Sequence, residues 1–381
     1  MRIVHITPHL PPDQAANALL PYQLGEWARA GGDEVEYVAH PPRAGAAAAA
    51  AGPVTWIPRR GDSRWHRLTR AGSVANAWRI WRDARPVIAR ADIVHVHSNG
   101  LLAELGAVFA RRLGKPVVLT LYGTEIWHYR PKRGIDLFTN AYRHAAIVTF
   151  YSERLLLRAR ELGLGRPECR VIYPPVAPSF VFHDEAAQTA RRAALGLTAR
   201  HVLVNVKRLH PLAGQIYLIE ALGEVVREHP DTRLVICGTG PLLGDLQRAA
   251  RAAGVERHVT FAGLVDNDMV AQYCAAADLF VLPSLLEALP TVAVEALASG
   301  TPVLSSDNPG GLELNDVFGD DVAVVPREQA APLADAIRAR LRAKRRTSPA
   351  THDIVERRFR AAAVAAEYWQ AYADARSGAG S

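Results

Sequence analysis

Short runs of apolar and β-branched residues alternate with longer stretches of helical periodicity along almost the whole chain. Continuous apolar runs bounded by turn residues predict strands of a parallel sheet, and the amphipathic stretches between them predict helices that cover it. The strands predicted in the first half are Arg2–Pro8, Glu34–Ala39, Asp92–His97, Pro116–Leu121, Ala146–Phe150 and Arg170–Tyr173. Those predicted in the second half are His201–Val206, Thr232–Cys237, His258–Ala262, Asp278–Pro283, Pro302–Ser305 and Val322–Val325. The pattern therefore indicates an α/β fold.

The alternation comes twice, which predicts two doubly wound, Rossmann-like domains over residues 1–177 and 178–353. The joint between them, Tyr173–Glu185, has three prolines and little periodicity, as linkers do. Ligands of such sheets bind beyond the carboxyl ends of the strands, so two facing domains would form a cleft for two substrates. The predicted helices include Asn99–Leu113, Ser152–Leu162, Gly214–Glu228, Pro241–Ala253, Asn267–Ala276, Pro290–Ala298 and a last helix over Ile354–Arg376.

The composition fits this two-domain picture and points to the cytoplasm. A length of 381 residues is long for one core. No apolar run of transmembrane length occurs, and the first residues lack the pattern of a secretory signal. The three cysteines, Cys169, Cys237 and Cys274, fit neither a zinc site nor a disulfide framework. Such cysteine usage is typical of a reducing cytosol.

The net charge of +7 is concentrated in one segment. Residues 59–90 hold nine arginines and two aspartates, together with Trp65, Trp78 and Trp81. Clustered arginine with tryptophan favours contact with a membrane surface or an anionic acceptor. The alternative is a solvated helix whose tryptophans pack inward. Nucleic acid is not a predicted partner, because no recognised binding motif accompanies the charge.

The most informative segment is 281–306, in which a buried strand ends at Pro283 and a helix is predicted with Pro290 as its first residue. Backbone N–H groups of Leu289 and Thr291 would then face the carboxyl end of the strand, where a helix N-terminus forms an anion site. Glu287 and Glu295 flank this site, with seven residues between them. Two carboxylates near bound phosphate make sense as acceptors for the hydroxyls of a sugar and a ribose on either side of a diphosphate.

On these motifs the chain resembles the retaining glycosyltransferases of the GT-B fold, in particular glycosyltransferase family 4 (group 1). The Glu pair is followed by the small-residue stretch ASGTPV at 298–303, as in that family. Further family-like segments occur in order along nearly the whole chain, namely DIVHVHS at 92–98, TLYGTE at 120–125, VKRLHPLAG at 206–214, CGTGP at 237–241 and VTFAGLV at 259–265. A Glu pair alone would be a weak signal, but the ordered set is specific.

The resemblance implies a role for each matching residue. Glu287 would hold the donor sugar near the reacting carbon, and Arg208 would neutralise the leaving phosphate. Glu295 would bind the ribose hydroxyls. The remaining donor-binding positions are Lys207, Gly238, Leu264, Val265, Leu289 and Thr291, of which Leu264 and Val265 would line the base. The acceptor-side positions are Asn17, His97, Tyr122, Thr124 and Glu125; for His97 a satisfied core histidine is an equal alternative.

The resemblance also implies an architecture and a reaction. The last helix would cross back to the N-terminal, acceptor-side domain, and the C-terminal domain would bind the nucleotide sugar. The family is thought to retain anomeric configuration by attack on the front face. A fixed arginine and a helix dipole stabilise a departing diphosphate without a metal, and no Asp-X-Asp motif stands in an obvious metal-binding loop. No cofactor is expected. We expect a UDP- or GDP-sugar as the donor and a glycan, lipid-linked or small-molecule acceptor. The protein is expected to be a monomer or dimer.

Three positions depart from the family pattern. The lysine that usually follows the arginine by five residues is Ala213, and Lys207 and His210 are the candidates to replace its charge. The glycine pair of the first loop is replaced by Ala15, Ala16 and Asn17, and the histidine of the T-x-H-G segment is Tyr122. These departures support one alternative, a non-catalytic nucleotide-sugar-binding protein of the same fold. A nucleotide-sugar epimerase of this fold is a further alternative.

Overall fold

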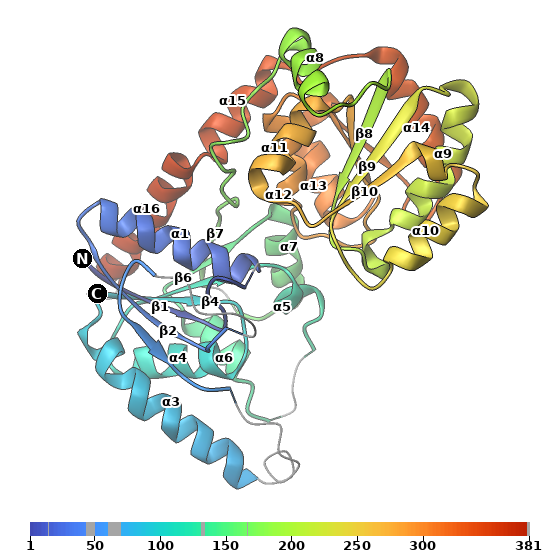
Figure 1. Cartoon of the computed structure of the whole chain (residues 1–381). Coiled ribbons are helices and arrows are strands. Elements are labelled where there is room, and N and C mark those ends of the chain that lie inside the picture. The colour runs from blue at the N-terminus through green and yellow to red at the C-terminus, as the bar shows by residue number, and fades with distance from the viewer. Residues whose placement is uncertain (14, 43–49, 60–69, 131–133, 166, 379–381) are drawn as a thin grey trace. The chain divides into compact units, whose positions relative to one another are not determined.

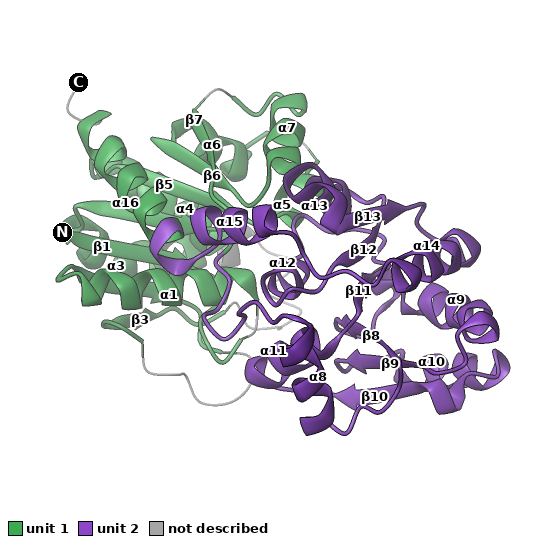
Figure 2. Ribbon diagram, turned by 90° about the horizontal axis from the view of Figure 1, so that it is seen from above, with its two compact units in different colours: residues 1–174, 364–381 green, residues 175–363 purple. Residues whose placement is uncertain are grey.

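The structure is a computed structural model that describes residues 1–13, 15–42, 50–59, 70–130, 134–165 and 167–378. The chain divides into two compact units (Figure 2), with Met1–Pro174 and Val364–Ser381 in unit 1 and Pro175–Ala363 in unit 2. Each unit has one parallel sheet between layers of helices, which confirms the α/β class with two Rossmann-like sheets.

The sheet of unit 1 has the strand order β3-β2-β1-β4-β5-β6-β7, and every strand pair is parallel. Its strands are β1 (Arg2–Thr7), β2 (Glu34–Ala39), β3 (Val54–Trp56), β4 (Ile93–His97), β5 (Val117–Leu121), β6 (Ile147–Phe150) and β7 (Glu168–Val171). The helices are α1 (Ala16–Ala30), α3 (Arg70–Arg90), α4 (Leu101–Arg112), α5 (Thr124–Trp127), α6 (Leu137–His144), α7 (Glu153–Glu161) and α16 (Ala361–Gly378). Helices α1 and α16 pack on one face of the sheet, and α3, α4, α6 and α7 pack on the other (Figure 1).

The sheet of unit 2 has the order β10-β9-β8-β11-β12-β13, again all parallel. Its strands are β8 (His201–Val206), β9 (Thr232–Cys237), β10 (Val259–Gly263), β11 (Leu279–Leu282), β12 (Val303–Ser306) and β13 (Val322–Val325). The α-helices are α8 (Glu185–Ala194), α9 (Gln215–Glu228), α10 (Leu243–Ala252), α11 (Asn267–Ala276), α12 (Thr291–Ala298), α13 (Pro309–Phe318), α14 (Ala330–Ala343) and α15 (Pro349–Arg358). Helices α9, α10 and α14 enclose the core on one face. The strand order reverses between β1 and β4 in unit 1 and between β8 and β11 in unit 2. Each unit therefore has a topological switch point.

The predicted last helix over 354–376 is wrong as a single element, because the chain breaks it at Phe359 and Arg360. The Phe359 carbonyl accepts a hydrogen bond of 2.7 Å from the Val176 N–H, and the Phe359 ring packs 5.5 Å from that of Phe318. A helix that ran on would need the Phe359 carbonyl for its own next turn. The break therefore ends α15 within unit 2 and starts α16, whose residues from Val364 onward belong to unit 1.

Strand β3 and helix α1 are among the elements of unit 1 that the sequence prediction did not name. Strand β3 is three residues long and only half-buried, so it lacks the apolar run that marks the other strands. Helix α1 begins at Ala16, inside the stretch predicted as the first loop. A proline such as Pro21 usually breaks a helix, but here the helix continues through it to Ala30.

Candidate functional site

An ion pair bridges the switch point of unit 2. Lys207 follows β8 and Glu287 follows β11, the two strands at which the order of the sheet reverses. The Lys207 Nζ lies 2.5 Å from the Glu287 Oε1, with side-chain exposures of 25% and 12%. Because the carboxyl ends of these strands are where ligands of such sheets bind, the pair places one cation and one hydrogen-bond acceptor in the expected position.

Gly238 allows the loop after β9 to pack tightly against the backbone of Lys207 in the loop after β8. Gly238 has a φ of +138°, and a Cβ there would lie 2.1 Å from the Lys207 carbonyl oxygen. The Gly238 N–H donates to the Gly263 carbonyl at 2.7 Å, and the Lys207 N–H donates to the Cys237 carbonyl at 3.0 Å. Gly238, predicted to bind the donor, thus has its N–H engaged within the protein and supports the backbone of Lys207.

The helix after Glu287 begins one residue later than predicted. Pro290 has an extended conformation and precedes α12, whose first residue is Thr291, so the prediction of Pro290 as the first helical residue is wrong. The Pro290 carbonyl accepts from the Ala293 N–H at 3.0 Å, which closes the first turn. No side chain caps this end, and the first N–H groups of a helix have no partner within it. Leu289 is buried, whereas Thr291 is half-exposed.

The start of α13 holds the Glu287 loop in place, a contact that sequence reasoning missed. The Gly310 N–H donates to the Glu287 carbonyl at 3.0 Å. A Cβ on Gly310 would lie 2.7 Å from the Glu287 Cβ and 3.0 Å from the Pro290 Cδ. The Asn308 side chain caps α13 by accepting from the Gly311 N–H at 3.1 Å, and it donates to the Ser284 carbonyl at 2.8 Å. The N-P-G-G sequence at 308–311 was the available signal, since Asn is a cap residue and Pro suits a first helical position.

Two of the predicted donor-binding residues, Arg208 and Leu264, have solvent-exposed side chains. Arg208 is exposed, and none of the described carboxylates pairs with it. Leu264, directly after β10, is 82% exposed although it is a large apolar residue. Val265 beside it is half-buried. An unpaired cation and an exposed apolar side chain at the carboxyl edge of one sheet suit a ligand that has both charged and apolar parts.

Glu295 differs from Glu287 in its surroundings. It projects from α12 among apolar neighbours and is half-buried. This burial raises the pKa of Glu295 to about 7. Burial, and next the charge of Glu295, raise the pKa of the Cys274 thiol. A carboxyl group that is costly to ionise is a common mark of functional residues, and Glu295 lies on the helix that follows the Glu287 loop.

The position of the missing family lysine lies in the interior. Ala213 has no exposed surface and ends the short 3₁₀ turn Pro211–Ala213. Gly214 follows with a φ of +66°, and a Cβ there would meet the Pro283 carbonyl oxygen at 2.0 Å. His210 is half-buried, and burial followed by the charges of Lys207 and Arg208 lowers its pKa. Lys207 is the better of the two candidates for the replacement charge, because it contacts Glu287 directly. The lowered pKa of His210 favours its neutral form.

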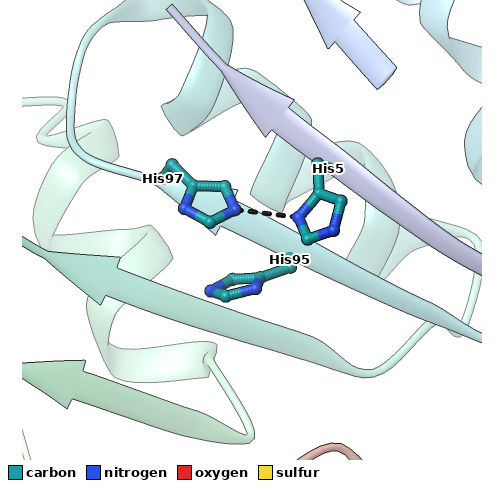
Figure 3. Close-up of side chains that lie close together, drawn as sticks. All are labelled: His5, His95 and His97. Carbon is teal, nitrogen blue, oxygen red and sulfur yellow. Dashed lines mark hydrogen bonds between the residues drawn. The ribbon is translucent and has the colours of Figure 1, made fainter. Parts of the chain in front are cut away.

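In unit 1 the predicted acceptor residue His97 lies in the core. His5, His95 and His97 from β1 and β4 gather there without exposed surface (Figure 3). The His5 Nδ1 lies 3.0 Å from the His97 Nε2, and the His97 Nδ1 lies 2.7 Å from the Tyr122 hydroxyl. Burial lowers the pKa of all three imidazoles, that of His5 to about 3. The structure favours the alternative of a satisfied core histidine for His97.

The three imidazoles meet the spacing of a metal site, with ligand atoms within 4.8 Å of one another. However, the Tyr372 hydroxyl lies 2.7 Å from the His95 Nδ1, and the Thr120 hydroxyl lies 2.6 Å from its Nε2. Both nitrogens of His95 are thus in hydrogen bonds. The arrangement is that of neutral rings in a buried polar network, which ties α16 to the sheet through Tyr372.

The other acceptor-side predictions lie near the carboxyl ends of β1, β4 and β5. Glu125 is buried and accepts hydrogen bonds from the Gly123 N–H at 2.9 Å and from the Ser98 hydroxyl. Thr124 is exposed, and both it and Glu125 line a cavity of about 300 Å³. Asn17, in the first turn of α1, accepts from the Thr7 hydroxyl through its carbonyl oxygen, and its side-chain oxygen is buried without a partner.

The basic segment 59–90 is only partly described, and Trp65 lies outside the described residues. The other two tryptophans lie on α3 in different environments. Trp81 packs edge-on against Phe109 at 4.7 Å, whereas Trp78 is 60% exposed beneath the Arg82 guanidinium. Among the described residues, no helix combines the length and the hydropathy needed to cross a membrane.

Comparisons with known proteins agree with this geometry. The family described as glycosyl transferases group 1 matches residues 188–357, and the one described as glycosyltransferase family 4 matches residues 21–180. The chain belongs to the family 4 glycosyltransferases.

Two curated relatives of this family 4 chain match it over part of its length. The chain is 33% identical, over 62% of its residues, to a GDP-mannose-dependent alpha-(1-6)-phosphatidylinositol monomannoside mannosyltransferase of Mycolicibacterium smegmatis. A 2-deoxystreptamine glucosyltransferase of Streptomyces kanamyceticus is 30% identical over 64% of the chain. The matches span 66% and 65% of these relatives, slightly less than two thirds of their length.

Solved structures match the family 4 fold over the whole chain. HepE of Anabaena in complex with UDP superposes with a TM-score of 0.76 at 19% identity, covering 98% of this chain and 100% of that chain. Sucrose-phosphate synthase of Thermosynechococcus elongatus gives a TM-score of 0.75 at 20% identity, covering 99% of both chains. At these identities the likeness shows the fold alone.

Proposed function

We propose that the protein is a glycosyltransferase that moves a sugar from a nucleoside-diphosphate sugar to an acceptor hydroxyl, and that unit 2 binds the donor. The observation that carries this proposal is the Lys207–Glu287 ion pair at the switch point of unit 2, next to the uncapped start of α12. A diphosphate needs cations and N–H donors, and a sugar needs a carboxylate acceptor. All three are supplied within the segments that follow β8 and β11.

Each part of the donor has a group of matching chemistry. The N–H groups at the start of α12, near Leu289 and Thr291, and the Arg208 guanidinium would hold the diphosphate. Glu287, oriented by Lys207 and by the Gly310 N–H, would accept hydrogen bonds from the sugar hydroxyls. Glu295 would do the same for the ribose. The exposed Leu264 and its neighbour Val265 would cover a face of the base.

The departing diphosphate is the centre of the proposed chemistry. As the glycosidic carbon gains positive charge, negative charge develops on the leaving oxygen, and fixed cations with a helix terminus stabilise it. Lys207, rather than a residue at position 213, supplies the second positive charge beside Arg208. Arg208, Lys207 and the start of α12 can stabilise this charge without a bound metal. We therefore propose metal-independent transfer with retention by front-face attack, as the family resemblance implies.

The relatives leave the choice of donor between two bases. The mycobacterial relative is described as GDP-mannose-dependent, whereas HepE is in complex with UDP. A GDP- or UDP-hexose is therefore the proposed donor class. For the acceptor, the unit 1 cavity lined by Thr124, Glu125, Glu104 and Asp136 would accept hydrogen bonds from hydroxyl groups. A glycan, lipid-linked or small polyhydroxyl acceptor fits this lining.

Ala213 favours one alternative, a protein that binds a nucleotide sugar without turning it over. The proposal is tested by following release of free nucleoside diphosphate from UDP- and GDP-sugars with polyhydroxyl acceptors in EDTA. We expect turnover with one base and retention in the product, and a loss of about 100- to 1000-fold in Glu287→Gln. Binding of a nucleotide sugar without turnover by the unmodified chain would support the non-catalytic alternative. Conversion of the donor without any acceptor would instead identify an epimerase.

A further inference from the structure

Unit 2 has a cavity at the edge of its sheet opposite the proposed donor site. This cavity has a volume of about 180 Å³ and lies among α8, the end of α14 and the residues just before β8 and β11. Strand β8 separates the two places, because Arg200 precedes its first residue and lines the cavity, whereas Lys207 follows its last residue. Six residues of strand span roughly 20 Å, so the two places share no side chain.

The lining of this cavity is strongly cationic. It includes the five arginines 192, 200, 340, 345 and 346 and Lys344, against the two carboxylates Glu185 and Asp278. One carboxylate is already neutralised, because the Arg192 Nη2 lies 2.6 Å from the Asp278 Oδ1. Asp321, outside the lining, pairs with Arg345. An excess of positive charge remains after these pairs are formed.

Several of the cations lack an acidic partner. Among the described residues, no carboxylate lies within ion-pair distance of Arg200, Arg340 or Lys344. Arg346 is held by carbonyl groups instead, including those of Ala277 at 2.8 Å and Ser299 at 2.7 Å. Burial lowers the pKa of Arg346 to about 10, against the nearby charge of Asp278. Burial, and next the charge of Arg345, also lower the pKa of Arg340, although Asp321 and Asp320 act in the opposite direction. Cations that crowd one another in a partly buried cavity are stabilised by a bound anion.

Lys344 occupies this place at a conformational cost. It ends α14 in the left-handed conformation, with a φ of +44°, and its N–H donates to the Arg340 carbonyl at 3.2 Å. Glycine is the usual residue at such a helix end, because a side chain is strained there. A lysine here carries its charge into the lining of the cavity, next to Arg345 and Arg346.

We propose that this cavity is a binding site for a small polyvalent phosphate anion, separate from the donor site. Guanidinium groups bind phosphate oxygens in a bidentate manner, and those of Arg200 and Arg340 line this cavity together with the Lys344 ammonium. The volume is below that of typical sites for drug-sized ligands, which suits a phosphate or diphosphate group rather than a whole nucleotide sugar. The phosphate could belong to a free anion or to a lipid headgroup, and we commit to the free anion.

The test is calorimetric titration with inorganic pyrophosphate at constant ionic strength. It is done in the Arg208→Ala background, so that the donor site is weakened. We expect saturable binding that falls about 10- to 100-fold on adding Lys344→Gly or Arg340→Gln. Lys344→Gly is the informative variant, because glycine accepts the left-handed conformation and the fold should be as stable as before, which thermal unfolding checks.

Four results would overturn the proposal. One is binding of pyrophosphate that Lys344→Gly and Arg340→Gln leave unchanged. Another is the absence of saturable binding in a chain that is folded. The third comes from sedimentation with phosphatidylglycerol vesicles: if Lys344→Gly weakens vesicle binding while free pyrophosphate does not bind, the phosphate is that of a lipid surface. Competition of pyrophosphate with sulfate at equal strength would likewise show a nonspecific basic surface.

Discussion

Glu287 and Glu295 belong to one sequence motif, yet the structure gives them different chemical environments. The Glu287 side chain is only 12% exposed, but it has a cation at 2.5 Å, so it is held as a charged hydrogen-bond acceptor. Glu295 has apolar neighbours, and its burial favours the neutral form up to about neutral pH. The difference follows from position, since one residue lies in the loop after β11 and the other projects from the helix that follows.

The raised pKa of Glu295 predicts a pH dependence of stability. The unfolded chain loses this proton near pH 4.5 and the folded chain near pH 7. The folded state thus binds more protons between these values, and its stability falls as the pH rises from about 4.5 to about 7. We expect Glu295→Gln to remove about 1–3 kcal/mol of this decline, allowing for partial exposure. Urea unfolding of both proteins at pH 5 and pH 7.5 measures it, and identical pH slopes would contradict the assignment.

Lys207 is predicted to replace the family lysine that Ala213 lacks. Removing the cation in Lys207→Ala should lower kcat/KM by about 10- to 1000-fold, because Glu287 and the leaving phosphate lose a fixed charge. Ala213→Lys in that background should restore part of the rate if its side chain reaches out from the buried position. A Lys207→Ala enzyme with unchanged kcat/KM would show that Lys207 is a surface residue without a part in transfer.

At this scale the sequence could name candidates but could not choose among them. Lys207 and His210 were equal candidates for the missing charge, and only the geometry shows that Lys207 contacts Glu287. His97 stood between substrate contact and core, and its burial with His5 and Tyr122 depends on β1 and β4 being neighbours. Such contacts join residues far apart in the chain, which single-sequence patterns do not reveal.

At the scale of elements, the site depends on how closely α13 approaches the Glu287 loop. Gly310 has no Cβ, so its N–H reaches the Glu287 carbonyl at 3.0 Å. This contact joins the loop between β11 and α12 to the start of α13, the helix that follows β12. The position of Glu287 is therefore set by two helix starts, one uncapped and the other capped by Asn308.

Gly310→Ala should displace this loop. The new Cβ would lie 2.7 Å from the Glu287 Cβ, so we expect destabilisation of about 1–3 kcal/mol and a fall in turnover of about 10- to 100-fold. Gly244→Ala is the matched control, because a Cβ there meets only the end of the Arg248 side chain at 3.6 Å in helix α10. It should stabilise by about 0.5–1 kcal/mol with turnover unchanged. Equal behaviour of the two variants in thermal unfolding and turnover would refute the role of Gly310.

Helix α3 offers a test of the proposed membrane contact. Trp78 is 60% exposed among arginines, whereas Trp81 packs against Phe109. Trp78→Ala should weaken sedimentation with anionic vesicles by several-fold without lowering stability. Trp81→Ala should instead lower stability by a few kcal/mol through loss of core packing. If Trp78→Ala leaves vesicle binding intact, the exposed tryptophan is only part of a solvated helix face.

The elements that the sequence predicted well are those with a strong apolar signal. Strands β2, β8, β9 and β13 and helix α11 have the predicted bounds. The start of α12 was misplaced by one residue, because a proline fits both the position before a helix and its first turn. The break at Phe359 was missed, because the residues on both sides have helical periodicity and a contact with Val176 decides it.

At the scale of the whole molecule, the two units share one topology but differ in the chemistry of their switch points. Unit 2 has an ion pair and an uncapped helix there, which suit a phosphorylated ligand. Unit 1 has neutral, buried imidazoles and a cavity whose polar lining mixes carboxylates and hydroxyls with Arg130 and His128, which suits a polyhydroxyl ligand. This asymmetry is consistent with a donor bound by one unit and an acceptor bound by the other.

The central claim is that unit 2 binds a nucleoside diphosphate through Arg208, Lys207 and Glu295, and one titration tests it most directly. The thermal unfolding midpoint is followed in EDTA with UDP, GDP, ADP and dTDP. A ligand at about 100 times its Kd adds about 2.7 kcal/mol of stability. The account predicts a clear rise with one nucleotide, UDP or GDP, that Arg208→Ala and Lys207→Ala abolish. No rise with any of the four, from a protein that unfolds cooperatively, would contradict it.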